Sequence, residues 1–174
     1  PAATEERAEA MWTTFKADPT GLYIEGRQVK AMLKEAANVL RVSLAKAASE
    51  RFAKRFTALK SKIAERLFVE TERVYLQRDG KALQKPDASE ERAIHVMGPH
   101  GPRNALKRVD YVEAPVTVTF TARWLDDGVV DDELLKTLLE YAGWNGLGAD
   151  RSTGSGRFEL LKLGDAFGVA LRHG

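Results

Sequence analysis

The sequence contains no cysteine. This absence excludes disulfide frameworks, thiolate zinc sites, iron–sulfur clusters and cysteine nucleophiles, and it is compatible with a reducing cytoplasm. The chain also lacks a run of the roughly 18 apolar residues that a membrane span requires, and no signal-peptide pattern opens it. We therefore expect a cytoplasmic protein without a membrane partner, and the length of 174 residues predicts a single domain, 1–174.

Basic and acidic residues nearly balance, with 27 Lys and Arg against 25 Asp and Glu, so the formal net charge is only +2. The charges are unevenly distributed, however. Residues 26–66 hold 11 Lys and Arg against 3 Glu, whereas residues 121–150 hold 7 acidic and 2 basic residues. A basic segment of this kind is either one face of a nucleic-acid-binding groove or the solvated face of a long helix.

Hydrophobic periodicity and turn residues predict a mixed order of helices and strands. Two features leave alternatives open: the stretch 27–66 is one long helix or two helices joined near Ser49, and a first strand either precedes Pro1 or is replaced by 22–24. With that strand, the order gives an α+β, ferredoxin-like core. The expected elements are helix 4–16, helical stretch 27–66, strand 67–76, turn 78–81, inserted excursion 78–112, strand 116–124, helix 134–141, glycine-rich loop 143–156, strand 158–163 and a last short strand 169–171.

The glycine-rich loop is the most distinctive local feature. It has five glycines in the 14 residues 143–156, and Arg151 and Arg157 add planar, fork-shaped donors that suit phosphate. The glycines follow a predicted helix and precede a predicted strand, which is the reverse of a dinucleotide fingerprint, and no Walker sequence is present. The loop is therefore either an anion-binding loop or a long flexible connection.

A second basic feature lies at the start of the predicted 27–66 helix. Gly26 precedes the helix, and Arg27, Lys30 and Lys34 form a stripe at i, i+3 and i+7. Cations near a helix N-terminus oppose the helix dipole, so an external anion would relieve a local cost. Ordinary surface charge is the other interpretation.

Together these segments resemble the RAMP superfamily of CRISPR-associated RNA-binding proteins, a family of antiviral defence. The closer likeness is to the branch that forms the repeated backbone of effector complexes, or to a viral or repurposed relative of that branch. Glu25-Gly26-Arg27-Gln28 stands where that family usually has Pro-Gly-Ser-Ser. The resemblance rests on Val29-Lys30-Ala-Met-Leu33-Lys34 at the helix start, on Ala64-Glu-Arg-Leu67-Phe68 after it, and on Leu138-Leu-Glu-Tyr-Ala142-Gly143-Trp-Asn-Gly146-Leu-Gly148-Ala-Asp-Arg151-Ser152-Thr-Gly154-Ser-Gly156-Arg157-Phe158.

The resemblance implies an RRM-like core whose first helix and glycine loop lie together and hold the backbone of a guide RNA. The excursion 78–112 would be an inserted thumb-like segment between the second and third strands, reaching nucleic acid or a neighbouring subunit. The partners would be single-stranded RNA, further copies of the chain and other subunits of the complex. The predicted nucleic-acid contacts are Arg27, Gln28, Lys30, Lys34, Arg103, Lys107, Arg108, Arg151, Ser152 and Arg157.

Catalytic and cofactor signals are weak. His95 and His100 lack an identifiable nucleophile or orienting partner, and without a third ligand they form a poor metal site. Asp110 is a candidate only because some relatives cut target RNA with a loop aspartate. The acidic residues of 126–133 are explained by turn and helix-start chemistry. We expect no enzyme activity, no metal and no cofactor.

Trp124 and Trp144 are candidate base-stacking residues, although core or rim packing is the simpler interpretation. The predicted function is non-catalytic binding of a single-stranded nucleic acid, and the resemblance implies that this is a guide RNA held by a repeated subunit of a ribonucleoprotein. Two alternatives stay open. One is an oligomeric assembly module that does not bind RNA, and the other is a histidine-dependent ribonuclease.

Overall fold

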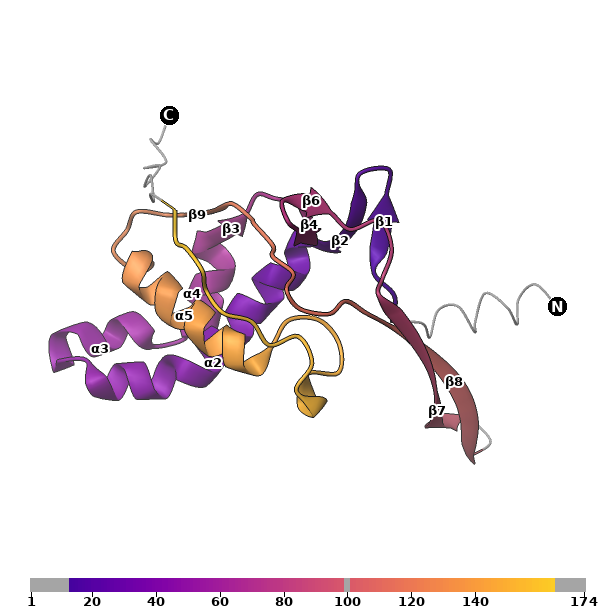
Figure 1. Ribbon diagram of the computed structural model, residues 1–174. Helices are drawn as coiled ribbons and strands as arrows, with labels where there is room; N and C mark the ends of the chain where they lie inside the picture. Colours follow the sequence, from indigo (N-terminus) through magenta and orange to yellow (C-terminus); the bar gives the residue numbers. More distant parts are fainter. Residues whose placement is uncertain (1–12, 99–100, 165–174) are drawn as a thin grey trace. The chain divides into compact units, whose positions relative to one another are not determined.

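The computed structural model describes residues 13–98 and 101–164 (Figure 1). The chain forms two compact units, each assembled from two separate stretches of sequence. We call the first, from residues 1–24 and 73–119, the strand unit, and the second, from residues 25–72 and 120–174, the helical unit. Within the described ranges the fold is mixed α+β, as the sequence predicts, with one three-stranded and three two-stranded sheets.

The strand unit contains a three-stranded sheet in the order β1-β2-β4, formed by β1 (Lys16–Asp18), β2 (Gly21–Glu25) and β4 (Arg73–Tyr75). The Asp18 carboxylate holds this sheet together. It accepts hydrogen bonds from the Thr20 and Gly21 amides and, through its second oxygen, from the Tyr75 hydroxyl at 2.7 Å and from Arg73. One side chain thus closes the β1–β2 turn and ties it to β4.

Two hairpins complete the strand unit. In the first, β5 (Gln77–Arg78) and β6 (Lys81–Ala82) are joined by the turn expected at 78–81, in which Asp79 and Gly80 both have positive φ. In the second, β7 (Ala88–Gly98) pairs along its whole length with β8 (Gly101–Tyr111). The excursion expected at 78–112 therefore consists largely of antiparallel hairpins.

The helical unit packs α2 (Gly26–Ala47) against α4 (Leu59–Arg66) and α5 (Asp132–Asn145). The short α3 (Glu50–Phe56) follows α2 in the sequence and also packs on it. A small sheet of β3 (Leu67–Val69) and β9 (Ala122–Trp124) adjoins them. The core follows the helical period. Its most buried side chains come from all three long helices and from β3: Val29, Leu33, Leu59, Ile63, Leu67 and Leu138.

The helical stretch 27–66 divides at the expected joint near Ser49 and again at Thr57–Ala58. Neither Gly nor Pro occurs at the second break, where Ala58 adopts a left-handed conformation with φ of 52°. The apolar side chains of the later part of this stretch are unequally buried: Phe52, on α3, is 57% exposed, while Leu59 and Ile63, on α4, are fully buried.

Several predicted elements differ from the structure. The strand expected at 67–76 is two strands, β3 and β4, in different sheets, and only residues 122–124 of the strand expected at 116–124 form a strand. Residues 158–163 form none, because their described backbone contact is one hydrogen bond from Phe158 to Gly143. Lys16 begins β1 rather than ending a helix, while 4–12 and 169–171 lie outside the described residues.

The helix expected at 134–141 is confirmed and is longer than predicted. Asp131 is its N-cap and accepts a hydrogen bond from the Leu134 amide at 2.8 Å, and Asp132 and Glu133 lie in its first turn, where the dipole favours acids. Its C-terminal extension to Asn145 means that the glycine-rich loop begins at Gly146. The ferredoxin-like arrangement and the single domain stay predictions.

Candidate nucleic-acid interface

The start of α2 is fixed by a close approach of two backbone segments. The Gly26 amide donates to the Glu72 carbonyl at 2.9 Å, and a Cβ on Gly26 would lie 2.1 Å from the Thr71 carbonyl oxygen. Only glycine fits here, because no side chain tolerates so short a distance. The close approach anchors the first turn of α2, which carries the predicted phosphate ligands.

Two of the predicted contacts, Arg27 and Gln28, are engaged with Glu25. The Gln28 side-chain oxygen accepts from the Glu25 amide at 2.9 Å as part of a capping box. The Arg27 guanidinium lies 2.6 Å from the Glu25 carboxylate, and the carboxylate raises the pKa of Arg27. Arg27 is nevertheless 76% exposed, so a phosphate would compete with Glu25 for it.

Lys30 is turned toward α4 and β3. Its ammonium donates to the Ala64 carbonyl at 3.0 Å and lies 5.2 Å from the centre of the Phe68 ring. Burial lowers the pKa of Lys30, and the neighbouring charge of Lys34 lowers it further. Among the described residues, the Lys34 side chain forms no hydrogen bond or ion pair.

The glycine-rich loop is closed at its base by two backbone hydrogen bonds. The Leu147 amide donates to the Gly156 carbonyl at 2.8 Å, and the Phe158 amide donates to the Gly143 carbonyl at 3.1 Å. Gly156 has φ of +73°, and its added Cβ would lie 2.0 Å from the Leu147 carbonyl oxygen. The glycines therefore build a defined turn rather than a long flexible connection.

The loop contacts α2 through Glu35. Arg151, in a short 3-10 helix (Arg151–Thr153), donates to the Glu35 carboxylate at 2.7 Å, and the Asn145 amide donates to its other oxygen at 3.1 Å. The hydrogen bond from Arg151 is the main cause that lowers the pKa of Glu35. An open hollow of about 480 Å³ lies at this contact, lined by Glu35, Asn145, Gly148, Asp150, Arg151 and Ser152.

Arg157 belongs to the same loop surface. A Cβ on Gly154 would lie 4.0 Å from the Arg157 guanidinium carbon, and the Gly154 amide donates to the Arg151 carbonyl at 3.0 Å. Arg157 and Ser152 are exposed. Three predicted phosphate ligands, Arg151, Ser152 and Arg157, are thus brought together beside the helix that carries Lys34.

The other predicted contacts lie on β8, in the strand unit. Lys107 faces Arg92 across the hairpin, and Arg103 is paired with Val96, although its side chain is outside the described part of the structure. Arg108 lies 3.5 Å from Asp110 and donates to the Ser89 hydroxyl at 3.3 Å. These residues gather on one hairpin.

In the described ranges, the surroundings of the residues considered for catalysis do not indicate a catalytic role. His95 is exposed on β7 opposite Asn104, and His100 lies outside the described residues. Asp110 accepts a hydrogen bond from Ser89 at 2.5 Å. Asp127 accepts from Arg66 at 2.7 Å, which agrees with the structural interpretation of the acids near α5. No group of three potential metal ligands occurs in the described ranges.

The two tryptophans differ in exposure. Trp124 is half-buried on β9, where it pairs with Leu67, so rim packing accounts for it. Trp144 is 77% exposed on the last turn of α5, so core packing does not explain it.

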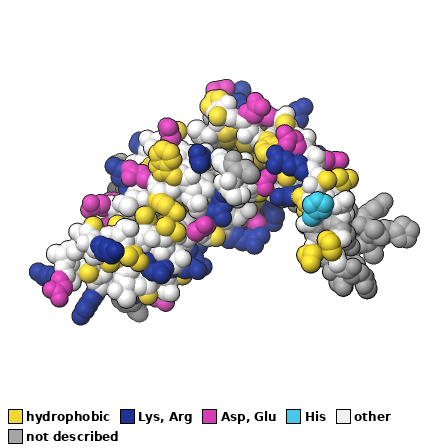
Figure 2. Space-filling model, turned by 90° about the horizontal axis from the view of Figure 1, so that it is seen from below, with side chains coloured by type: hydrophobic (Ala, Val, Ile, Leu, Met, Phe, Trp, Pro, Cys, Tyr) yellow, Lys and Arg dark blue, Asp and Glu magenta, His cyan; other side chains and the backbone are white. Residues whose placement is uncertain are grey.

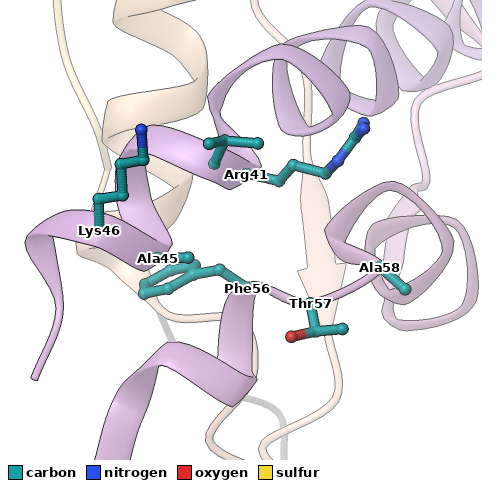
Figure 3. Close-up of a pocket in the computed structure, with 7 residues that line it drawn as sticks. Arg41, Ala45, Lys46, Phe56, Thr57 and Ala58 are labelled. Atoms are coloured by element: carbon teal, nitrogen blue, oxygen red, sulfur yellow. The ribbon is translucent and has the colours of Figure 1, made fainter. Parts of the chain in front are cut away.

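A second open hollow, of about 370 Å³, lies where the end of α2 meets α3 and α4. Figure 3 shows the Phe56 ring beside Ala45, with the charged ends of Arg41 and Lys46 turned away from the ring. No polar groups converge in this hollow, so it does not suggest a ligand.

Sequence reasoning missed Glu35 and Asn145, which hold the loop against α2. One signal for Glu35 was available, because it is the only acid in the basic stretch from Gly26 to Ser49.

On the face drawn in Figure 2, the Lys and Arg side chains over the helical unit are interspersed with Asp and Glu.

Comparisons with family models, with curated proteins and with solved structures found no match to this chain. In the part of the chain that the structure describes, no helix is long and apolar enough to cross a membrane.

Proposed function

We propose that this chain binds the backbone of a single-stranded RNA without cleaving it, as a repeated subunit of a CRISPR-type ribonucleoprotein. The proposal includes membership of the RAMP superfamily and a ferredoxin-like or RRM-like core, both of which rest on the sequence resemblance. The protein would be cytoplasmic, and its partners would be RNA, copies of itself and other subunits of the complex.

The observation that carries the proposal is the contact between the glycine-rich loop and α2. Through Glu35, this contact brings Arg151 and Ser152 to an open hollow, while Arg157 lies on the same loop and Lys34 directly precedes Glu35 on α2. Guanidinium groups bind phosphate oxygens in a bidentate manner, and the loop glycines let the backbone approach closely. The arrangement suits a chain of phosphates better than a small enclosed ligand, because the hollow is open and polar.

The test removes two cations that have no ion-pair partner among the described residues, in the variant Lys34→Gln/Arg157→Gln. Binding of a labelled oligouridine is measured by fluorescence anisotropy at several salt concentrations. Loss of two phosphate contacts is expected to weaken binding and to reduce the slope of log K against log salt by about 1.4, from about 0.7 per contact on a single strand.

The matched control is Lys54→Gln/Lys60→Gln, which removes the same charge from exposed positions on α3 and α4. Equal losses in both variants would reduce the effect to net charge, and unchanged binding in the first variant would contradict the assignment. RNA of uniform length that copurifies from untreated lysate would support a guide, whereas protein that stays free of nucleic acid at low salt would contradict RNA binding.

One observation favours a second candidate, an assembly module that does not bind RNA. The β7–β8 hairpin exposes large apolar side chains, with Met97 83% and Leu106 63% exposed. Such side chains are typical of a surface that contacts another protein. Oligomers that form without nucleic acid and survive nuclease treatment, but dissociate in Leu106→Glu, would favour this candidate.

A further inference from the structure

We propose that Trp144 is a stacking platform for one unpaired base of the nucleic acid whose phosphates lie on Arg151 and Arg157. This inference rests on the proposed function and deepens it, because stacking selects a single strand with accessible bases. Its starting point is the 77% exposure of the indole, which lies on the last turn of α5 directly before the loop.

The backbone places Trp144 and Arg157 on neighbouring segments. Residues 143–147 and 156–158 are joined by the bond from Leu147 to Gly156 and by the bond from Phe158 to Gly143. Trp144 lies between the two bonded positions on one segment, and Arg157 lies between them on the other. The indole and the guanidinium are therefore supported by the same short backbone ladder.

Gly143 makes this proximity possible. It is buried, and a Cβ at this position would lie 2.4 Å from the Phe158 carbonyl oxygen. The glycine lets the returning chain pass directly against the last turn of α5. The platform consequently sits on the last turn of α5, with the returning chain packed against that turn.

An exposed aromatic ring on one segment and an arginine on the segment bonded to it match the two parts of a nucleotide. The indole offers a surface for a base, and the arginines offer paired donors for its phosphates. Every base has a π-face, so binding of this kind tolerates different sequences. The bases of a duplex are stacked on each other, so the platform favours a single strand.

The experiment compares a single-stranded oligouridine with an abasic sugar–phosphate strand of the same length. Both strands have about 20 nucleotides, which is long enough to span one binding site of this kind. The full chain should bind the oligouridine more tightly than the abasic strand. Trp144→Ala should lower the affinity for oligouridine by about tenfold, the range for one stacked base, and remove the preference. Trp144→Phe should retain most of the preference for oligouridine, because phenylalanine also offers an aromatic face.

The control variant is Phe52→Ala, which removes another exposed aromatic ring, 57% exposed on α3, and should leave both affinities unchanged. The salt slope should not change in Trp144→Ala, because no phosphate contact is lost. Circular dichroism of each variant should match that of the parent chain, since both side chains are exposed.

Four outcomes would overturn the inference. If the parent chain binds both strands equally, or if Trp144→Ala retains full affinity for oligouridine, the stacking role is wrong while the proposed function stands. If Trp144→Ala changes the oligomeric state and not the RNA affinity, the indole is a protein contact. If neither strand binds at low salt, the proposed function fails, and the inference fails with it.

Discussion

Replacing Glu35 by glutamine is expected to strengthen RNA binding. In the free protein the Glu35 carboxylate occupies Arg151 at 2.7 Å, so a phosphate must displace it before it can bind this guanidinium. Glutamine keeps an oxygen that can accept the hydrogen bond from Asn145 but carries no charge. The variant therefore frees Arg151 without removing the whole contact between the loop and α2.

The structure sets the expected magnitude. Both side chains are partly exposed, 34% for Arg151 and 43% for Glu35, so solvent screens the pair. Exposed pairs of this kind contribute about 0.5 to 1 kcal/mol, which corresponds to a gain of about two- to fivefold in affinity. The loss of the pair should lower the melting temperature by only a few degrees.

The assay is anisotropy of a labelled oligouridine near 0.1 M salt, where exposed charges more than about 10 Å apart are largely screened. Glu140→Gln is the control, because it removes the same charge from an exposed pair with Lys136 on α5. Equal gains in both variants would show a general effect of net charge. A loss of affinity in Glu35→Gln, with the fold intact, would refute the reasoning and make the pair a structural tether.

Three further predictions concern stability and local geometry. Gly143→Ala should destabilise the chain and expose Phe158, because the added Cβ would lie 2.4 Å from the Phe158 carbonyl oxygen; a thermal melt tests this, and an unchanged melt would contradict it. Ile63→Ala should lower the free energy of unfolding by about 2 to 5 kcal/mol, since its side chain is fully buried, and a urea titration in which the midpoint does not move would contradict this. The hydrogen bond from Tyr75 is the largest cause that lowers the pKa of Asp18 from 3.8 to about 2. The Asp18 carboxylate therefore contributes stability above about pH 4, and this contribution is lost as the pH falls toward 2. An acid titration of Asp18→Asn should lack this loss, and parallel acid curves for the variant and the parent chain would contradict it.

The helices were predictable where burial follows a regular period. The spacing of Val29, Leu33 and Ile63 marks a core face that packing then fills. The break at Ala58 was not predictable, because alanine is a good helix former and no local signal accompanies its positive φ. Residues 158–163 were wrongly predicted as a strand because apolar content does not by itself provide a partner strand.

The candidate site was only partly readable from the sequence. Arg151 and Arg157 stand out because phosphate chemistry needs forked donors near flexible backbone. The role of Glu35 depends on a contact with Arg151 across 116 residues of chain, which residue spacing does not encode. Gln28 was assigned to phosphate, yet its capping of the Glu25 amide is a local interaction that the sequence could have suggested.

The division of the chain has a consequence for folding. Residues 73–119 of the strand unit interrupt the helical unit, and residues 25–72 of the helical unit interrupt the strand unit, so each unit is an insertion in the other. When either unit folds, it brings together the ends of the segment that belongs to the other and removes part of that unit's loop-closure entropy. The two should therefore fold cooperatively, and a simple truncation yields neither alone. α5 packs on α2 only after the ribosome has released the intervening strands, so the helical core closes late in synthesis.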